Sequence, residues 1–290
     1  MNSRDSLGDR MKAYEHINRT YLPKRMPVII RLDGCHFHTF TRGFAKPFDE
    51  MLISTMRETA LELCKAIEGV KLAYTQSDEI TLLLTNNDTW ETQPWFGNNI
   101  QKMTSVAASL ATLHFNRIWG NKCEEHLSYH EAWLMFDSGY ASKEEVETKE
   151  KLSNTYQKSL NSGATFDARV FILPEDEVCN CLIWRQQDAI RNSIQMMGQA
   201  HFSHKELMNK SCEDIKHMLV EKNIKWESLP LNYQRGSCVK KELTEVKTIV
   251  NVAENTQNTI SRMKWTIDDK IPLFWENRGY VDNLLRAKEN

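Results

Sequence analysis

The sequence has no long hydrophobic run. Of its 290 residues, 41% are hydrophobic and 26% are charged, which is typical of a globular chain, and no stretch approaches the roughly 20 apolar residues that cross a bilayer. The first residues, MNSRDSLGDRMKAYEH, are polar and lack the apolar centre of a secretory signal. We therefore expect a cytoplasmic protein without a membrane partner, built as one large domain or two modest ones.

Cysteine pairs at metal-binding spacing are also missing. The seven cysteines are scattered along the chain, and no two of them stand in a C-x-x-C arrangement. The sequence therefore indicates neither a zinc site nor a disulfide framework, and we interpret most of the cysteines as reduced, small apolar residues.

An excess of positive charge is absent as well. The formal net charge of −2 argues against a strongly basic, generic nucleic-acid binder. It is compatible with a local basic groove, because phosphate binding depends on where the charges lie rather than on their sum.

Apolar patterns predict an antiparallel sheet backed by helices. Short β-rich runs predict strands, apolar residues at helical spacing predict helices, and the polar TQSDE between two strands predicts a hairpin tip. We expect an α+β fold of ferredoxin-like or polymerase-palm type. The expected elements are strands over 26–32, 70–74, 80–85 and 168–174, and helices over 48–68 and 100–119.

The second half of the chain carries mainly helical signals. A helical pattern runs from Asp176 to about Gln199, and two capping-box patterns follow it. The acidic and polar stretch 131–161 predicts an exposed loop or insertion. The tail from Lys240 mixes charge with apolar residues and gives no placement. We expect a palm-like catalytic domain over 1–175 and a mainly helical C-terminal region over 176–290.

Carboxylates stand at two predicted strand ends, Asp33 before Gly34 and Asp78 before Glu79. If the first strand lies beside the hairpin, both ends reach the same edge of the sheet. That geometry suits Mg²⁺, which takes one or two carboxylates together with waters and substrate phosphates, and two such ions can support an in-line displacement at phosphorus. Asp-Gly is also an ordinary turn and Ser-Asp-Glu an ordinary hairpin tip, so both interpretations stay open on the pattern alone.

Five ordered motifs add a resemblance. IIRLDGCHFHTF, GFAKPFD, AYTQSDEITLLL, FDARVFILP and WRQQDAIRNSI together resemble the tRNA-histidine guanylyltransferase superfamily, whose members add nucleotides in the 3′-to-5′ direction. The resemblance spans about residues 26–194.

The resemblance implies a set of functional residues. It assigns two Mg²⁺ ions to Asp33, the carbonyl of Gly34, and Asp78, and catalytic roles to Asp33, Asp78 and Glu79. It implies ATP, GTP and other nucleoside triphosphates as substrates, tRNA contacted by the C-terminal region, and a homotetramer built as a dimer of dimers. The implied nucleotide-binding residues are Asp33, Gly34, Cys35, His36, Phe37, His38, Lys46, Ser77, Asp78 and Lys102.

Several of these residues have a simpler interpretation. Lys46 before Pro47 could be solvated, although a lysine suits a triphosphate, and Lys102 could be an ordinary exposed helix lysine. His36 and His38 are expected to act through their backbone more than through their rings.

One motif departs from the eukaryotic branch of the family. Where that branch has His-Ile-Asn-Asn, this chain has Ile190, Arg191, Asn192 and Ser193. The chain thus resembles the guanylyltransferase-like branch, which adds templated nucleotides to 5′-truncated tRNAs. Arg191 could contact the RNA backbone or form an ion pair with Asp188. We interpret Trp184, Arg185 and Gln186 as structural core and its polar support rather than as a base-stacking site.

The resemblance implies two phosphoryl transfers. A 5′-monophosphorylated tRNA end is adenylylated by ATP, and the 3′-hydroxyl of an incoming nucleotide then attacks that end. Three alternatives stay open: a strict tRNA-histidine enzyme that adds G at position −1, a nucleotide cyclase, which needs no RNA, and a non-catalytic RNA-binding protein.

Overall fold

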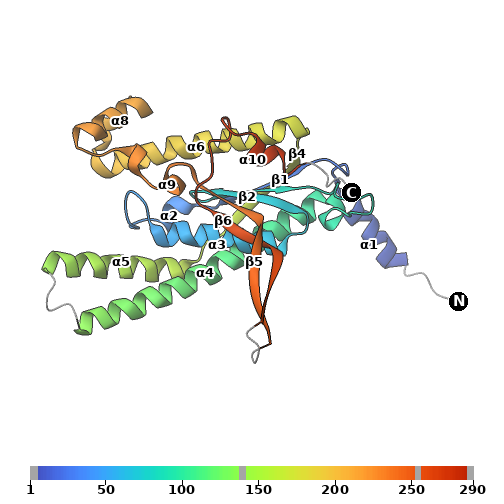
Figure 1. The fold of residues 1–290 in the computed structure, drawn as a ribbon, viewed down its shortest axis with the longest axis horizontal. Helices are drawn as coiled ribbons and strands as arrows, with labels where there is room; N and C mark the ends of the chain where they lie inside the picture. Colours follow the sequence, from blue (N-terminus) through green and yellow to red (C-terminus); the bar gives the residue numbers. More distant parts are fainter. Residues whose placement is uncertain (1–5, 137–141, 252–255, 286–290) are drawn as a thin grey trace.

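The computed structural model describes residues 6–136, 142–251 and 256–285, and a six-stranded antiparallel sheet forms its centre (Figure 1). The strand order is β4-β1-β3-β2-β5-β6. The predicted α+β fold is confirmed. The strands are β1 Val28–Gly34, β2 Val70–Gln76, β3 Glu79–Leu84, β4 Phe166–Ile172, β5 Ser237–Asn251 and β6 Thr256–Asp268.

Helices cover both faces of this sheet. Figure 1 shows α3 and α4 on one face and α6 on the other. The helices are α1 Ser6–His16, α2 Phe37–Phe40, α3 Glu50–Ala66, α4 Ile100–Phe136, α5 Lys143–Ser162, α6 Glu175–His201, α7 His204–Leu207, α8 Cys212–Glu221, α9 Leu231–Arg235 and α10 Gly279–Asp282, with short 3-10 turns η1 Trp95–Asn98 and η3 Trp226–Ser228.

Strand β1 lies between β3 and β4, and this position explains its apolar sequence. Ile30 and Leu32 pack in the core under α3 and α4, whereas Ile29 packs in the core under α6. Because side chains alternate along a strand, Arg31 and Asp33 share the α6 side with Ile29. The strand thus carries its carboxylate to its own end, next to α6.

The helix boundaries follow local capping chemistry. Asp49 caps α3 by accepting a hydrogen bond from the Leu52 N–H at 3.0 Å. Both capping boxes expected after α6 are present, with Ser203 at the start of α7 and Ser211 at the start of α8.

The prediction of an exposed loop over 131–161 is wrong. Helix α4 continues to Phe136 and α5 begins at Lys143, so the two form an antiparallel pair (Figure 1); residues 137–141 lie outside the described residues. Helix α5 is charged on most of its surface and buries only a narrow stripe that includes Tyr156 and Ser159. Such a stripe gives a weak sequence signal.

The tail from Lys240 extends the sheet. Strand β5 pairs with β2 only over Leu72–Thr75, and its continuation pairs with β6 as a two-stranded ribbon beyond the sheet (Figure 1). The C-terminal region is therefore helical from α6 to α9 and then contributes strands. The sheet takes strands from both sides of residue 175, and a domain boundary there stays a prediction.

Two expectations from missing sequence features can be compared with the structure. The described residues include all seven cysteines, none of which forms a disulfide, and Cys64, Cys123, Cys179 and Cys238 are buried. Within the described ranges, no helix is both long and apolar enough to span a membrane.

Candidate active site

The two carboxylates at strand ends lie together. Strands β1 and β3 pair with Asp33 opposite Glu79, and the Gly34 N–H donates to the Asp78 carbonyl over 3.1 Å. Asp33 and Asp78 line one hollow. The hairpin register thus places the end of β1 against the tip between β2 and β3, as the sequence predicts.

Gly34 is required at this junction by a close approach. A Cβ atom on Gly34 would lie 2.2 Å from Cδ2 of Phe37, and the Phe37 ring is held by Phe40, Phe115 and Phe166. The ring cannot move aside without disturbing a packed aromatic core. The Cys35 N–H donates to the Thr165 carbonyl at 2.8 Å, which ties the turn to β4.

The chain then reverses sharply into α2. His36 has a φ of 55°, and its side chain and that of His38 are exposed, which leaves Phe37 to enter the core. The hairpin tip has a similar turn, because Ser77 has a φ of 50° and its hydroxyl donates to Asp78 Oδ1 at 3.0 Å. Ser77 thus contacts the carboxylate of Asp78 directly.

Burial makes the charge on Asp78 costly. Loss of hydration raises the pKa of Asp78, and the negative charge of Asp33 raises it further, whereas the hydroxyl of Ser77 lowers it. A cation between the two carboxylates would relieve both effects. In the described part of the chain, no group of three or more His, Cys, Asp or Glu side chains is arranged to hold a metal ion. Two carboxylates and a carbonyl fit Mg²⁺, which completes its shell with waters and phosphates.

Glu79 has a different environment from its neighbour. Its Oε1 accepts a hydrogen bond from Arg185 Nε at 2.7 Å, and the two side chains are 8% and 10% exposed. Burial raises the pKa of Glu79 and Arg185 opposes that shift. Arg185 also binds Asp188 at 2.8 Å. Glu79 therefore fastens the hairpin to α6, and the prediction that Arg185 is polar support within the core agrees with this geometry.

Three hollows meet at Ser77. The loop-side hollow is lined by His38, Lys46, Ser77 and Asp78, and the helix-side hollow by Ser77, Asp78, Asp33 and residues of α6. A third, more apolar inner hollow lies behind Ser77 and is lined by side chains of α3, α6 and α9. Asp78 thus lines both the loop-side and the helix-side hollow, which allows two substrates to reach it through different openings.

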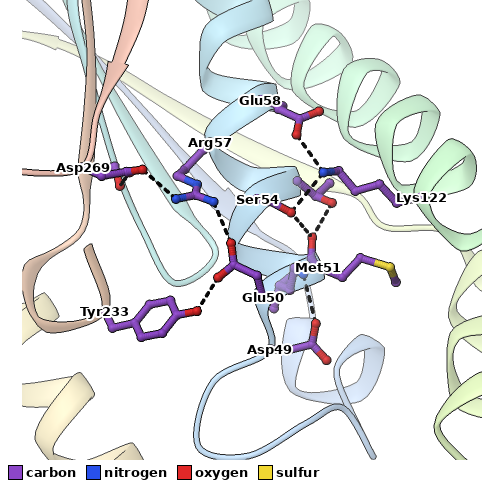
Figure 2. Close-up of polar contacts among 12 residues, drawn as sticks. Asp49, Glu50, Met51, Ser54, Arg57, Glu58, Lys122, Tyr233 and Asp269 are labelled. Carbon is purple, nitrogen blue, oxygen red and sulfur yellow. Dashed lines mark hydrogen bonds and ion pairs between the residues drawn. The ribbon is translucent and has the colours of Figure 1, made fainter. Parts of the chain in front are cut away.

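A polar network forms one wall of the inner hollow. Figure 2 shows Arg57 of α3 between Glu50 and Asp269, with 2.8 Å to each carboxylate, and Tyr233 of α9 donating to Glu50. Lys122 of α4 binds Glu58 at 2.7 Å in the same view. These contacts fix α3 against α4, α9 and the end of β6.

The structure brings most of the predicted nucleotide-binding residues together, with Lys102 as the exception. Lys46 is exposed and lines the loop-side hollow. Lys102 lies over the Phe96 ring at 4.6 Å in a separate hollow with Arg19 and Tyr21. Thr112 of the same helix contacts the start of β4, and a rise of 1.5 Å per residue puts Lys102 about 15 Å farther along α4. A phosphate-binding role for Lys102 stays a prediction.

Sequence reasoning missed several residues around the carboxylates. Arg31 and Asn192 line the helix-side hollow, and Asp167 pairs with Asp33 across β1 and β4. The prediction that Trp184 belongs to the structural core is wrong, because its side chain is 53% exposed. Strand alternation from Asp33 could have identified Arg31, whereas Trp184 and Asn192 depend on how α6 lies over the sheet.

Comparisons with known proteins agree with this fold. The family model for tRNAHis guanylyltransferase matches residues 8–174, which is more than half of the chain. A curated protein of Dictyostelium discoideum described as a probable tRNA(His) guanylyltransferase is 25% identical over 89% of this chain and 90% of its own length.

Solved structures give a stronger likeness. A bacterial tRNA(His) guanylyltransferase-like protein in complex with ATP is 40% identical, with a TM-score of 0.74 over 98% of this chain and 100% of the other. A structure of such a bacterial protein in complex with GTP is 38% identical, with a TM-score of 0.72 and the same coverage.

Proposed function

We propose, from the premise that this chain belongs to the tRNAHis guanylyltransferase family, that it repairs the 5′ end of truncated tRNA by templated 3′-to-5′ nucleotide addition. The family makes the chain a nucleotidyltransferase of the tRNA guanylyltransferase type. The observation that carries the finer proposal is the arrangement of residues 190–193 on α6, together with the 40% identity to a guanylyltransferase-like protein over nearly the whole chain.

Only one of these four residues faces the active site. Asn192 lines the helix-side hollow. Ser193 is buried and accepts a hydrogen bond from the Trp226 indole at 3.0 Å, and Ile190 packs in the small core around α8. Arg191 is 59% exposed and pairs with Asp188. This helix offers no histidine to the site, which favours an enzyme that does not depend on one particular tRNA.

The proposed reaction has two balanced steps. An oxygen of the RNA 5′-monophosphate attacks the α-phosphorus of ATP, pyrophosphate leaves, and the RNA end becomes adenylylated. The 3′-hydroxyl of the incoming nucleoside triphosphate then attacks the 5′-phosphorus of the RNA, AMP leaves, and the hydroxyl proton passes to solvent. A 5′-triphosphorylated end can enter at the second step with pyrophosphate as the leaving group.

The chain positions the reactants for both steps. Asp33, Asp78 and the Gly34 carbonyl would hold two Mg²⁺ ions, which lower the pKa of an attacking hydroxyl and neutralise a leaving phosphate when bound. Lys46 on the loop-side hollow is suited to the triphosphate. The buried pair of Glu79 and Arg185 fastens the hairpin tip to α6.

Alanine substitutions test the catalytic assignment. Asp33→Ala and Asp78→Ala should give folded proteins in which addition to a truncated tRNA is all but abolished. The measurement is extension of a labelled, 5′-truncated tRNA with ATP and nucleoside triphosphates, with and without Mg²⁺. Addition near the wild-type rate by either variant would overturn the two-metal site.

A second assay tests the substrate. Full-length tRNA-histidine and a 5′-truncated non-histidine tRNA are offered together, and we expect templated addition to the truncated RNA. A marked preference for the full-length RNA, with an untemplated G added to it, would identify a strict tRNA-histidine enzyme instead. A cyclic product formed from nucleoside triphosphate alone would identify a cyclase.

A further inference from the structure

The face of the sheet under α6 carries its side chains in cross-strand rows. The row nearest the hairpin tip is acidic, with Asp33 opposite Glu79 and Asp167. The next row away from the tip has Arg31 of β1 opposite Arg169 of β4. Directly opposite residues of an antiparallel pair point to the same face, so the side chains of Arg31 and Arg169 start from neighbouring positions on that face, next to the acidic row.

In the described ranges, neither of these two arginines forms a direct ion pair. Arg31 is close enough to Glu79 to lower the pKa of that carboxyl, but Arg31 Nε is buried without a hydrogen-bond partner. Like charges directly opposite each other destabilise a strand pair. Repulsion between the two arginines thus destabilises the strand pair in the free protein, and a bound anion would remove that repulsion.

An exposed aromatic ring of α6 lies next to Arg31. Trp184 of α6 is 53% exposed, and its ring has the Arg31 guanidinium at 5.5 Å and the Arg185 guanidinium at 4.4 Å from its centroid. Arg185 is committed to Glu79 and Asp188, whereas Arg31 is not. Trp184, Arg31 and Asp33 line the same helix-side hollow.

This opening is separate from the one that suits the triphosphate. Lys46 and His38 line the loop-side hollow, and Ser77 and Asp78 stand between the two openings. An RNA end and a nucleotide must meet at the carboxylates, so a nucleotide on the loop side leaves the helix side for the RNA.

We propose that Trp184, Arg31 and Arg169 form a docking platform for the 5′-terminal segment of the RNA. The indole stacks on the terminal base, and the two arginines bind a backbone phosphate beside it. Stacking accepts any base and phosphate contacts carry no sequence information, so the platform suits truncated ends of different sequence. The inference rests on the proposed function, and it names the residues that would bring the RNA end to the carboxylates.

Binding of a 5′-truncated tRNA tests the platform. Trp184→Ala should raise the Kd for the RNA about tenfold, as expected for the loss of one base stack, and Trp184→Phe should fall between it and the wild type. The KM for the nucleoside triphosphate should stay unchanged. Arg169→Gln should weaken binding and lower the slope of log K against log salt by about 0.7 to 0.9, the value for one phosphate contact, whereas Trp184→Ala should keep the slope.

Trp90 provides a matched control. It is 88% exposed and has the Arg25 guanidinium 4.2 Å from its ring centroid, but it lies beyond the far end of β3. Trp90→Ala should bind the RNA as the wild type does. An equal loss in Trp90→Ala, an unchanged Kd in Trp184→Ala, or a raised KM for the nucleotide with unchanged RNA binding would each overturn the platform. A wild-type protein that adds no nucleotide to any RNA would reject the proposed function, while the comparison of Kd values would still decide the platform.

Discussion

Asp33, Asp78 and Glu79 are three neighbouring carboxylates whose positions suit them to two different roles, cation binding and the attachment of the hairpin to α6. Asp78 lies at the hairpin tip, where burial raises its pKa and the charge of Asp33 raises it further. Glu79 follows it in the sequence but points to α6, where Arg185 compensates for its burial. The first arrangement is suited to binding a cation, and the second to holding two elements together.

The pair of Glu79 and Arg185 can be tested by stability. Arg185→Met leaves a buried carboxylate without its partner, which should lower the free energy of unfolding by about 3–5 kcal/mol at pH 7. Urea unfolding measures the loss. Adding Glu79→Gln to Arg185→Met should recover part of it, because the uncompensated charge is then removed.

Arg191 supplies the control for this prediction. It also pairs with Asp188, but its side chain is 59% exposed, and exposed pairs contribute about 0–1 kcal/mol. A loss in Arg191→Gln as large as that in Arg185→Met would show that burial does not set the cost.

Among the elements, helix α5 contacts the edge of the loop-side hollow through a hydrogen bond to Asp49. The Tyr156 hydroxyl of α5 donates to Asp49 Oδ2 at 2.8 Å, and the same oxygen accepts from the Ala45 N–H at 3.0 Å. Asp49 thus caps α3 and holds the loop that carries Lys46. Helix α5, which lines neither hollow at the carboxylates, thus supports the loop that forms the loop-side hollow.

Tyr156→Phe removes that hydroxyl and little else. A buried hydrogen bond to a carboxylate is worth about 1.5–3 kcal/mol, so the free energy of unfolding should fall by that amount in urea. The KM for the nucleoside triphosphate should rise because the loop loses a support. Tyr129→Phe, on an exposed side chain of α4, should change neither quantity, and an unchanged KM in Tyr156→Phe would separate the helix pair from nucleotide binding.

The same helix pair should weaken in mild acid. Burial and the neighbouring His130 lower the pKa of His126 from 6.5, whereas the negative charge of Asp49 opposes the shift; His126 also lies beside Ser153 and the Tyr156 ring. Below pH 6.5, His126 is therefore protonated more readily in the unfolded chain than in the folded chain. Stability should fall as the pH falls from 6.5 toward the folded pKa and should be level above 6.5.

His126→Gln isolates this contribution. The difference in melting temperature between wild type and variant is measured at pH 7.5 and at pH 5.5, so that groups common to both proteins cancel. We expect the wild type to lose its advantage at the lower pH. A difference that is the same at both pH values would contradict the assignment to His126.

The elements also show what the sequence could predict. Strands β1 to β3 and helices α3 and α6 follow from local apolar periodicity and caps, and the register that joins Asp33 to Asp78 follows from the hairpin. Helix α5 was missed because its buried stripe is narrow among many charges. Strands β5 and β6 were missed because pairing of β5 with β2 and with β6, rather than a local preference, makes them strands. Trp184 lies on α6, which begins more than 140 residues after β1 ends. Its exposure depends on how α6 packs on the sheet, and a local sequence pattern does not show this.

In the whole molecule, the acidic tip of the sheet lies against the middle of α6 and beside the loop after α2. The loop after α2 forms one opening and α6 forms the other, so the acidic tip is reached from two sides. A reaction between a nucleotide and an RNA end needs this arrangement, because both reactants must be held at the same carboxylates at the same time. The core on both faces of β1 keeps that tip rigid.

Magnesium should therefore stabilise the whole fold through this tip. With Mg²⁺ and ATP at 100 times their apparent Kd, the free energy of unfolding should rise by about 2.7 kcal/mol, seen as a higher melting temperature. Asp78→Asn should lose most of this increase. Without metal, Asp78→Asn should be at least as stable as the wild type at pH 7. Burial raises the pKa of Asp78 in the folded wild type, so folding disfavours the charged carboxylate that the variant lacks. Asp167 is an exposed carboxylate opposite Asp33, and Asp167→Asn should keep the increase in melting temperature. If both variants lost the increase equally, the cation would not be held by the pair of Asp33 and Asp78.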